Sequence, residues 1–232
     1  MTRIRLAIIG DGKMGLAVRE LATNAGFDIV AFLGEHEVSA DGPTTKQFAG
    51  AEVAVEFTVP AAAPANVLAC VRAGVPVVCG TTGWNDDRAR VEGAVLAAGA
   101  ALFVAPNFSV GVHLFTRIVE FAAAELAAIP EQFGIHMVET HHAGKKDAPS
   151  GTAKLLADRV KRALGREVPI TSIRSGEVPG THEIVLTAPF EQIRVTHEAR
   201  DRHVFAAGAL TAARWVVGKQ GVFTMDDLLE TR

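Results

Sequence analysis

The feature that most constrains the fold is an apolar run that ends in a glycine-rich turn. Residues 4–9 form a short, almost wholly apolar segment, as expected for a strand buried on both faces. Gly-Asp-Gly-Lys-Met-Gly follows at residues 10–15, and apolar residues at helical spacing continue to Ala25. Residues 27–33 have the composition of a second strand. This order of strand, glycine turn, helix and strand predicts a parallel α/β unit.

The glycine turn indicates a binding site for a dinucleotide. A G-x-G-x-x-G turn between a strand and a helix lets the backbone turn tightly and approach a pyrophosphate at the helix N-terminus. The candidate cofactor-binding residues of the turn are Gly10, Asp11, Gly12, Lys13, Met14 and Gly15.

The end of the second expected strand leaves the choice of cofactor open. Gly34 stands where a ribose-binding carboxylate often falls, and Glu35 is one residue later. Glu35 could reach a ribose 2′-hydroxyl, whereas Lys13 and His36 could accept a 2′-phosphate. NADH and NADPH are therefore both candidates.

The α/β alternation continues to residue 105. Strands are expected at 53–57, 75–79 and 102–105, with helices at 61–73 and 85–98. Each strand ends in a small or polar turn, and parallel strands bring such ends to one edge of the sheet. The pattern predicts a Rossmann-type domain with a nucleotide crevice. A long helix at 110–128 then leads into a second domain.

Strands follow one another more directly in the second half of the chain. They are expected at 135–140, 170–174, 182–187 and 192–198, with one helix at 152–164. Successive strands without intervening helices predict an α+β domain with a mixed or antiparallel sheet.

The candidate chemistry gathers in residues 139–153, Glu-Thr-His-His-Ala-Gly-Lys-Lys-Asp-Ala-Pro-Ser-Gly-Thr-Ala. His141 and His142 can hold or move a proton near neutral pH. Lys145 and Lys146 offer positive charge to an anion. The Ser-Gly-Thr turn after the proline signals a helix start, whose amides favour a carboxylate or phosphate.

This segment resembles the signature E-x-H-H-x-x-K-x-D-A-P-S-G-T-A of the 4-hydroxy-tetrahydrodipicolinate reductase (dihydrodipicolinate reductase) family. The family's F-T-x-P, G-T-T-G and A-x-N-F-S-x-G-V segments are matched at 57–60, 80–83 and 105–112, so the resemblance covers nearly the whole chain. Two departures concern the nicotinamide side. His113 replaces the asparagine of most members, and the glycine turn is one residue shorter than the commoner form.

The resemblance implies NAD(P)H-dependent reduction of 4-hydroxy-tetrahydrodipicolinate to tetrahydrodipicolinate, a step of lysine and diaminopimelate biosynthesis. It also implies that the tail returns to the first domain. A discontinuous dinucleotide-binding domain would comprise 1–108 and 206–232, and residues 109–205 would bind substrate and form a homotetramer.

The resemblance further assigns roles to individual residues. His141 would donate the proton, and Lys145 would be a second donor or would stabilise the developing anion. His142, Gly151, Thr152 and, more loosely, Arg202 would contact the dicarboxylate. The residues expected around nicotinamide and its ribose are Gly80, Thr81, Thr82, Ala105, Pro106, Asn107 and Phe108.

Composition limits the other partners. A net charge of −3 lacks the basic character of a nucleic-acid binder, and no run approaches the length of a membrane span. The N-terminus leads into a strand and not a signal peptide. Cys70 and Cys79 have no metal-ligand spacing, which favours reduced thiols in a cytoplasmic protein.

Three alternatives are compatible with parts of the pattern. An aspartate- or homoserine-type dehydrogenase would share the N-terminal half but would not account for Lys145 through Thr152 as a unit. A dinucleotide sensor would need the glycine turn but not His141 or Lys145. A metal site on His141, His142 and Asp147 lacks the spacing of known sites, so no metal is expected. Whether the hydrated or dehydrated substrate is bound stays open.

Overall fold

The computed structural model describes residues 2–129 and 131–230, so Met1, Pro130 and the last two residues of the tail lie outside the described part. The chain divides into two compact units. The first comprises residues 1–109 and 202–232, and the second comprises 110–201. The expected divisions, after 108 and after 205, lie one and four residues away from these.

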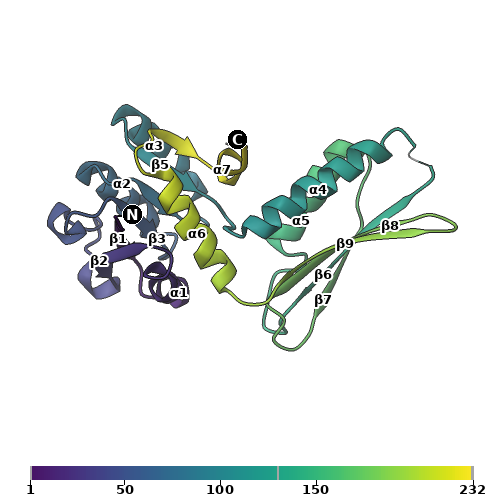
Figure 1. Cartoon of the computed structure of the whole chain (residues 1–232), viewed down its shortest axis with the longest axis horizontal. Coiled ribbons are helices and arrows are strands. Elements are labelled where there is room, and N and C mark those ends of the chain that lie inside the picture. The colour runs from purple at the N-terminus through teal and green to yellow at the C-terminus, as the bar shows by residue number, and fades with distance from the viewer. Residues whose placement is uncertain (1, 130, 231–232) are drawn as a thin grey trace. The chain divides into compact units, whose positions relative to one another are not determined.

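The first unit contains a six-stranded parallel sheet with the order β10-β5-β4-β3-β1-β2 (Figure 1). Because β2 and β3 lie on opposite sides of β1, the chain reverses its direction of winding beside β1. Ligands bind at such a switch point in open α/β sheets. The strands are β1 (Ile4–Ile9), β2 (Phe27–Leu33), β3 (Val53–Glu56), β4 (Val77–Cys79), β5 (Ala101–Val104) and β10 (Gly221–Phe223).

Two pairs of helices pack against this sheet. Helices α2 and α3 contact each other and strands β3 to β5, whereas α1 contacts α6. Strand residues alternate between the faces, and Ala54, Val77 and Leu102 belong to the core beneath α2 and α3. The helices are α1 (Lys13–Ala22), α2 (Ala63–Ala73), α3 (Asn85–Ala97), α6 (His203–Val216) and α7 (Met225–Glu230), with 3-10 helices η1 (Glu35–Glu37) and η2 (Thr45–Phe48).

The C-terminal part of the first unit contains one strand that the sequence pattern did not indicate. The short strand β10 pairs in parallel with β5 and extends the sheet at its edge. A three-residue strand carries little periodicity of its own, because it takes its structure from the strand beside it.

The second unit contains a four-stranded mixed sheet with the order β7-β6-β8-β9. Strand β7 is parallel to β6, and β8 and β9 follow in antiparallel pairs. The mixed sheet expected from the sequence is therefore confirmed. Helices α4 and α5 pack side by side, as Figure 1 shows. The elements are α4 (Val110–Leu126), β6 (Gly134–His141), α5 (Gly151–Leu164), β7 (Ile170–Arg174), β8 (Gly180–Thr187) and β9 (Gln192–Ala199).

The core of the second unit forms between the helix pair and the sheet. Phe115 and Val119 of α4 meet Leu156 and Val160 of α5 above Met137 of β6. The i, i+4 spacing on both helices places these residues on one face. In the described part of the chain, no helix combines the length and the apolar character that crossing a membrane requires.

Candidate active site

The packing around the turn after β1 explains its glycines. Gly10 has a φ of +109°, and a Cβ there would lie 2.0 Å from the Phe57 carbonyl oxygen. A Cβ on Gly15 would lie 1.9 Å from the Gly10 carbonyl oxygen. Gly12, at the N-terminus of α1, would meet nothing within 4 Å. The outer glycines therefore allow close packing, and the middle one leaves the helix start open to a ligand.

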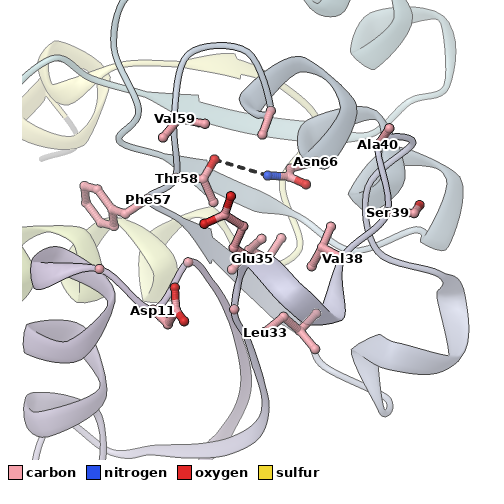
Figure 2. A pocket seen from close by; sticks show the side chains of 15 residues that line it. Asp11, Leu33, Glu35, Val38, Ser39, Ala40, Phe57, Thr58, Val59 and Asn66 are labelled. Atoms are coloured by element: carbon pink, nitrogen blue, oxygen red, sulfur yellow. Dashed lines mark hydrogen bonds between the residues drawn. The ribbon is translucent and has the colours of Figure 1, made fainter.

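A cavity of about 520 Å³ lies at the carboxyl ends of β1, β2 and β3. Figure 2 shows Asp11, Glu35, Thr58 and Asn66 among the side chains that line it. Asn66 Nδ2 donates to Thr58 Oγ1 at 3.2 Å. Within the described residues Asn66 Oδ1 has no hydrogen-bond partner, so the cavity wall contains an unsatisfied acceptor.

A second cavity of about 470 Å³ shares Gly12, Phe57 and Thr58 with the first. The second cavity extends from the glycine turn to the turn after β4. Gly80 is required there because a Cβ would lie 1.9 Å from the Phe57 ring. The candidate cofactor residues that line this second cavity are Gly12, Lys13, Met14, Gly80, Thr81 and Thr82.

The candidates at residues 105–108 do not line either cavity. Ala105 is buried, and the Phe108 ring packs against the rings of Phe57 and Phe103. Pro106 is exposed and Asn107 is partly buried. Phe108 therefore supports the core beneath the turn, and contact of this segment with nicotinamide stays a prediction.

Three carboxylates surround the end of β2. A Cβ on Gly34 would lie 2.5 Å from Asp11 Oδ2 and 3.0 Å from Glu37 Oε2. The Gly34 amide donates to the Glu37 carboxylate, and Glu35 lines the first cavity. Lys13 lines the second cavity and is not among the residues that line the first. The end of β2 thus carries a group of carboxylate oxygens, which are acceptors of the kind that ribose hydroxyls require.

A buried carboxylate lies beneath the first cavity. Glu56, the last residue of β3, is fully buried and accepts hydrogen bonds from the Thr58 hydroxyl and from Asn66 Nδ2. The Cys79 thiol donates to it at 3.1 Å. Burial, and next the Glu56 charge, raise the pKa of this thiol. The network therefore orders the polar wall of the cavity and keeps Cys79 a thiol.

In the second unit, Glu139 and His141 lie on one face of β6, because side chains two residues apart in a strand point the same way. His141 Nδ1 contacts the Glu139 carboxylate, which is fully buried. Arg174 Nη2 donates to Glu139 Oε1 at 2.8 Å. Burial alone raises the pKa of Glu139, but hydrogen bonds, above all from Arg174, outweigh it and lower the pKa to about 2.

A second imidazole completes this cluster. His182 is the cross-strand partner of Glu139, and its ring centroid lies 5.2 Å from that of His141. Burial and the neighbouring His141 lower the pKa of His182 to about 4. Burial also lowers the pKa of His141, although Glu139 opposes that shift. Both rings therefore favour the neutral state in the resting protein.

The start of α5 is joined to the same cluster. Ser150 is the N-cap, and its Oγ accepts from the Ala153 amide at 3.1 Å. That hydroxyl also contacts His182 Nε2 at 3.3 Å, and the Ser150 amide donates to Glu139 Oε1 at 3.4 Å. Gly151 and Thr152 begin the helix, and Gly151 is exposed. A helix start suited to an anion is thus coupled to the imidazole pair.

The loop between β6 and α5 carries the remaining candidates. Lys145 Nζ forms an ion pair of 2.7 Å with Asp147, which lowers the pKa of that carboxyl group. Arg174 also donates to the Asp147 carbonyl oxygen at 2.6 Å. His142 is exposed beside His141. Arg202 is exposed at the N-terminus of α6, in the first unit.

The metal alternative built on His141, His142 and Asp147 does not have the required geometry. Of the described residues, the one group with metal-ligand spacing is Glu139, His141 and His182, whose ligand atoms lie within 4.8 Å of one another. His142 and Asp147 are outside it. Arg174 already supplies a positive charge to Glu139, so these side chains suit the transfer of a proton better than the binding of a cation.

Four residues of this cluster had no assigned role in the sequence pattern: Glu139, Ser150, Arg174 and His182. A signal existed for two of them, since Glu-x-His on a strand shares one face and Ser before Gly-Thr marks an N-cap. Arg174 and His182 come from β7 and β8, and only the register of these strands brings them to β6.

Comparison with known proteins connects both units to one family. The family model described as dihydrodipicolinate reductase, N-terminus, matches residues 4–108, and the model of its C-terminus matches residues 111–229. A 4-hydroxy-tetrahydrodipicolinate reductase of Christiangramia forsetii is 34% identical, with 97% of this chain and 98% of the relative covered. One of Archaeoglobus fulgidus is 36% identical, with coverage of 98% and 100%.

Solved structures agree on the fold. A dipicolinate-bound dihydrodipicolinate reductase from Paenisporosarcina has a TM-score of 0.79 at 22% identity, over 96% of this chain and 97% of that one. GenD2 from gentamicin A biosynthesis, in complex with NAD, has a TM-score of 0.57 at 14% identity, over 99% and 91%. With both family models matched along nearly its full length, the chain belongs to the dihydrodipicolinate reductase family of NAD(P)H-dependent oxidoreductases.

Proposed function

We propose that this protein reduces 4-hydroxy-tetrahydrodipicolinate, or its dehydrated form, to tetrahydrodipicolinate with NAD(P)H, in the biosynthesis of diaminopimelate and lysine. The observation that carries the proposal is the coupling of an imidazole pair to a helix start in the second unit. A proton donor beside an anion site suits the reduction of a ring that carries carboxylates. The C-terminal family match covers this cluster, which distinguishes the chain from dehydrogenases that share only a nucleotide domain.

His141 is the proposed proton donor. Reduction adds a hydride to one ring atom and a proton to its neighbour, so a positioned acid is required. Bound reduced nicotinamide would supply the hydride. Lys145 would deliver a second proton or stabilise the developing anion by its charge. Its ion pair with Asp147 holds the ammonium group close to the β6–α5 loop.

The substrate carboxylates require donors. The amides of Gly151 and Thr152, in the first turn of α5, are proposed for one carboxylate because a helix N-terminus favours an anion. His142, exposed beside His141, would contact the ring or the same carboxylate. Arg202 is proposed for the remaining carboxylate.

The cofactor would bind in the first unit. The glycine turn would hold the pyrophosphate, and Glu35 would accept from a ribose hydroxyl in the first cavity. The second cavity would receive the nicotinamide half near Gly80, Thr81 and Thr82. Contacts from residues 105–108 are proposed as well, through the exposed Pro106 and its neighbours.

The test is a spectrophotometric assay of NADH and NADPH oxidation, with substrate generated in place from pyruvate and aspartate semialdehyde by the preceding synthase. His141→Ala and Lys145→Ala should each lower kcat by about 10²- to 10⁴-fold while dinucleotide binding persists. A wild-type protein that binds dinucleotide but oxidises none would refute the reductase and favour a sensor.

We also propose a cytoplasmic homotetramer assembled through the second unit. Ile173 on β7 and Phe190 in the β8–β9 turn are large apolar side chains with substantial exposure, as expected where another subunit packs against the second unit. Cys70 and Cys79 are free thiols, in keeping with a reducing compartment. Light scattering that reports a monomer at micromolar concentration would contradict the tetramer.

A further inference from the structure

Glu139 has no role in the chemistry proposed above, yet both of its carboxylate oxygens are engaged. Oε2 contacts His141 Nδ1, and Oε1 accepts from Arg174 and from the Ser150 amide. The side chain is fully buried, and it extends from β6 to contact Arg174 of β7 and Ser150 at the start of α5. One carboxylate therefore joins the proposed proton donor to the proposed anion site.

The contact with Glu139 determines which nitrogen of His141 carries the proton. An ionised carboxylate accepts hydrogen bonds only, so Nδ1 must be the donor. Nε2 is then the atom that remains to exchange a proton. A Cβ on Gly180 would lie 3.1 Å from this nitrogen, so the glycine at the start of β8 leaves Nε2 uncrowded.

Arg174 prevents Glu139 from taking the proton itself. Its guanidinium group donates to Oε1 at 2.8 Å, and a carboxyl group beside a guanidinium stays ionised. The other charged or titratable groups that face His141 are His182 from β8 and Lys145 from the loop. Burial disfavours the imidazolium most, Glu139 opposes it, and the charges of Lys145 and Arg174 add to the effect of burial.

We propose that Glu139 is a positioning residue of the proton transfer, which holds His141 with its proton on Nδ1, stabilises the imidazolium and ties this ring to the first turn of α5. This role rests on the proposed function of His141. It assigns Arg174 as the group that keeps Glu139 charged, and it explains why a buried ion pair between β6 and β7 lies beside the start of α5.

The test compares Glu139→Gln with Glu183→Gln. Glutamine keeps the size of Glu139 but removes its charge, whereas Glu183 forms a Glu–Arg pair with Arg194 on the same sheet and is not part of the His141 cluster. In Glu139→Gln we expect kcat to fall about 10- to 100-fold with an unchanged KM for the dinucleotide. Because the His141 imidazolium loses its stabilising charge, kcat/KM should begin to decline at a lower pH than in the wild-type protein. Glu183→Gln should behave as wild type.

A second readout does not depend on activity. Long-range ¹H–¹⁵N NMR of the wild-type imidazoles, assigned with His141→Gln, should report neutral His141 with its proton on Nδ1. A proton on Nε2 would overturn the proposal even if Glu139→Gln fails to fold. So would a folded Glu139→Gln with unaltered kcat and pH profile. If the wild-type protein shows the Nδ1 proton but reduces no substrate, the positioning stands and the reductase function fails.

Discussion

Two buried glutamates, one in each unit, have opposite surroundings. Glu56 in β3 is bonded by neutral donors, namely a hydroxyl, an amide and a thiol. Glu139 in β6 is bonded by a guanidinium group and an imidazole. Both side chains are fully buried. The charge of its partners therefore decides what a buried glutamate can do. Glu56 orders the polar wall of a cavity, whereas Glu139 is placed to hold the proposed proton donor.

The largest expected effect comes from removing the charge partner of Glu139. Arg174→Met keeps much of the volume but leaves a buried carboxylate without its guanidinium, which should lower the free energy of unfolding by about 3 kcal/mol. Urea unfolding, followed by circular dichroism, measures it. The double variant Glu139→Gln/Arg174→Met should recover part of the loss. A loss below about 0.5 kcal/mol, typical of an exposed pair, would contradict a buried ion pair.

Acid should weaken the second unit through the same cluster. The pKa of His182 falls from 6.5 to about 4 on folding, and that of Glu139 from 4.5 to about 2. In both cases the unfolded chain binds more protons, so stability present above pH 6.5 is lost as the pH falls towards 4 and then 2. Urea midpoints measured across this range should drop. In His182→Gln, the urea midpoint should depend less on pH in the upper part of this pH range. An unchanged dependence on pH would contradict a buried, neutral His182 ring.

Replacing Glu56 should cost less than breaking the Glu139 ion pair. Glu56→Gln retains one acceptor oxygen for neutral donors, so we expect a loss of about 1–2 kcal/mol together with weaker dinucleotide binding. The pH dependence of kcat/KM should stay that of wild type. Fluorescence titration with NADH and a pH–rate profile measure the two properties. A shift in the pH dependence of kcat/KM would show that Glu56 also influences the proton transfer, which would contradict the difference drawn between Glu56 and Glu139.

The smallest effect concerns the carboxylates at the end of β2, which contact solvent. Asp11, Glu35 and Glu37 should favour NADH over NADPH because a 2′-phosphate would meet like charge. Glu35→Ala should raise kcat/KM for NADPH relative to NADH by about tenfold, equivalent to ~1.4 kcal/mol. Steady-state kinetics with both cofactors measure the ratio. Preference for NADPH in the wild-type protein would instead implicate Lys13 or His36.

Local features of the sequence determined much of this protein. The glycines at 10–15 predict their turn because backbone packing at Gly10 and Gly15 excludes a side chain. The parallel α/β order of the first unit and the mixed sheet of the second also follow from periodicity and helix placement. Glu-x-His on one strand already implies that Glu139 and His141 share a face. Each of these signals acts over a few residues, and so it can be read from the chain.

The groups that surround His141 depend on the tertiary structure. Arg174 lies opposite His141 in the β6–β7 register, and His182 lies opposite Glu139 in the β6–β8 register. A shift of either register by one residue would turn these side chains to the other face of the sheet. The short strand β10 likewise forms because it pairs with β5. Strand register depends on packing between distant segments, so the sequence pattern indicated the chemistry of His141 but not the ion pair that controls it.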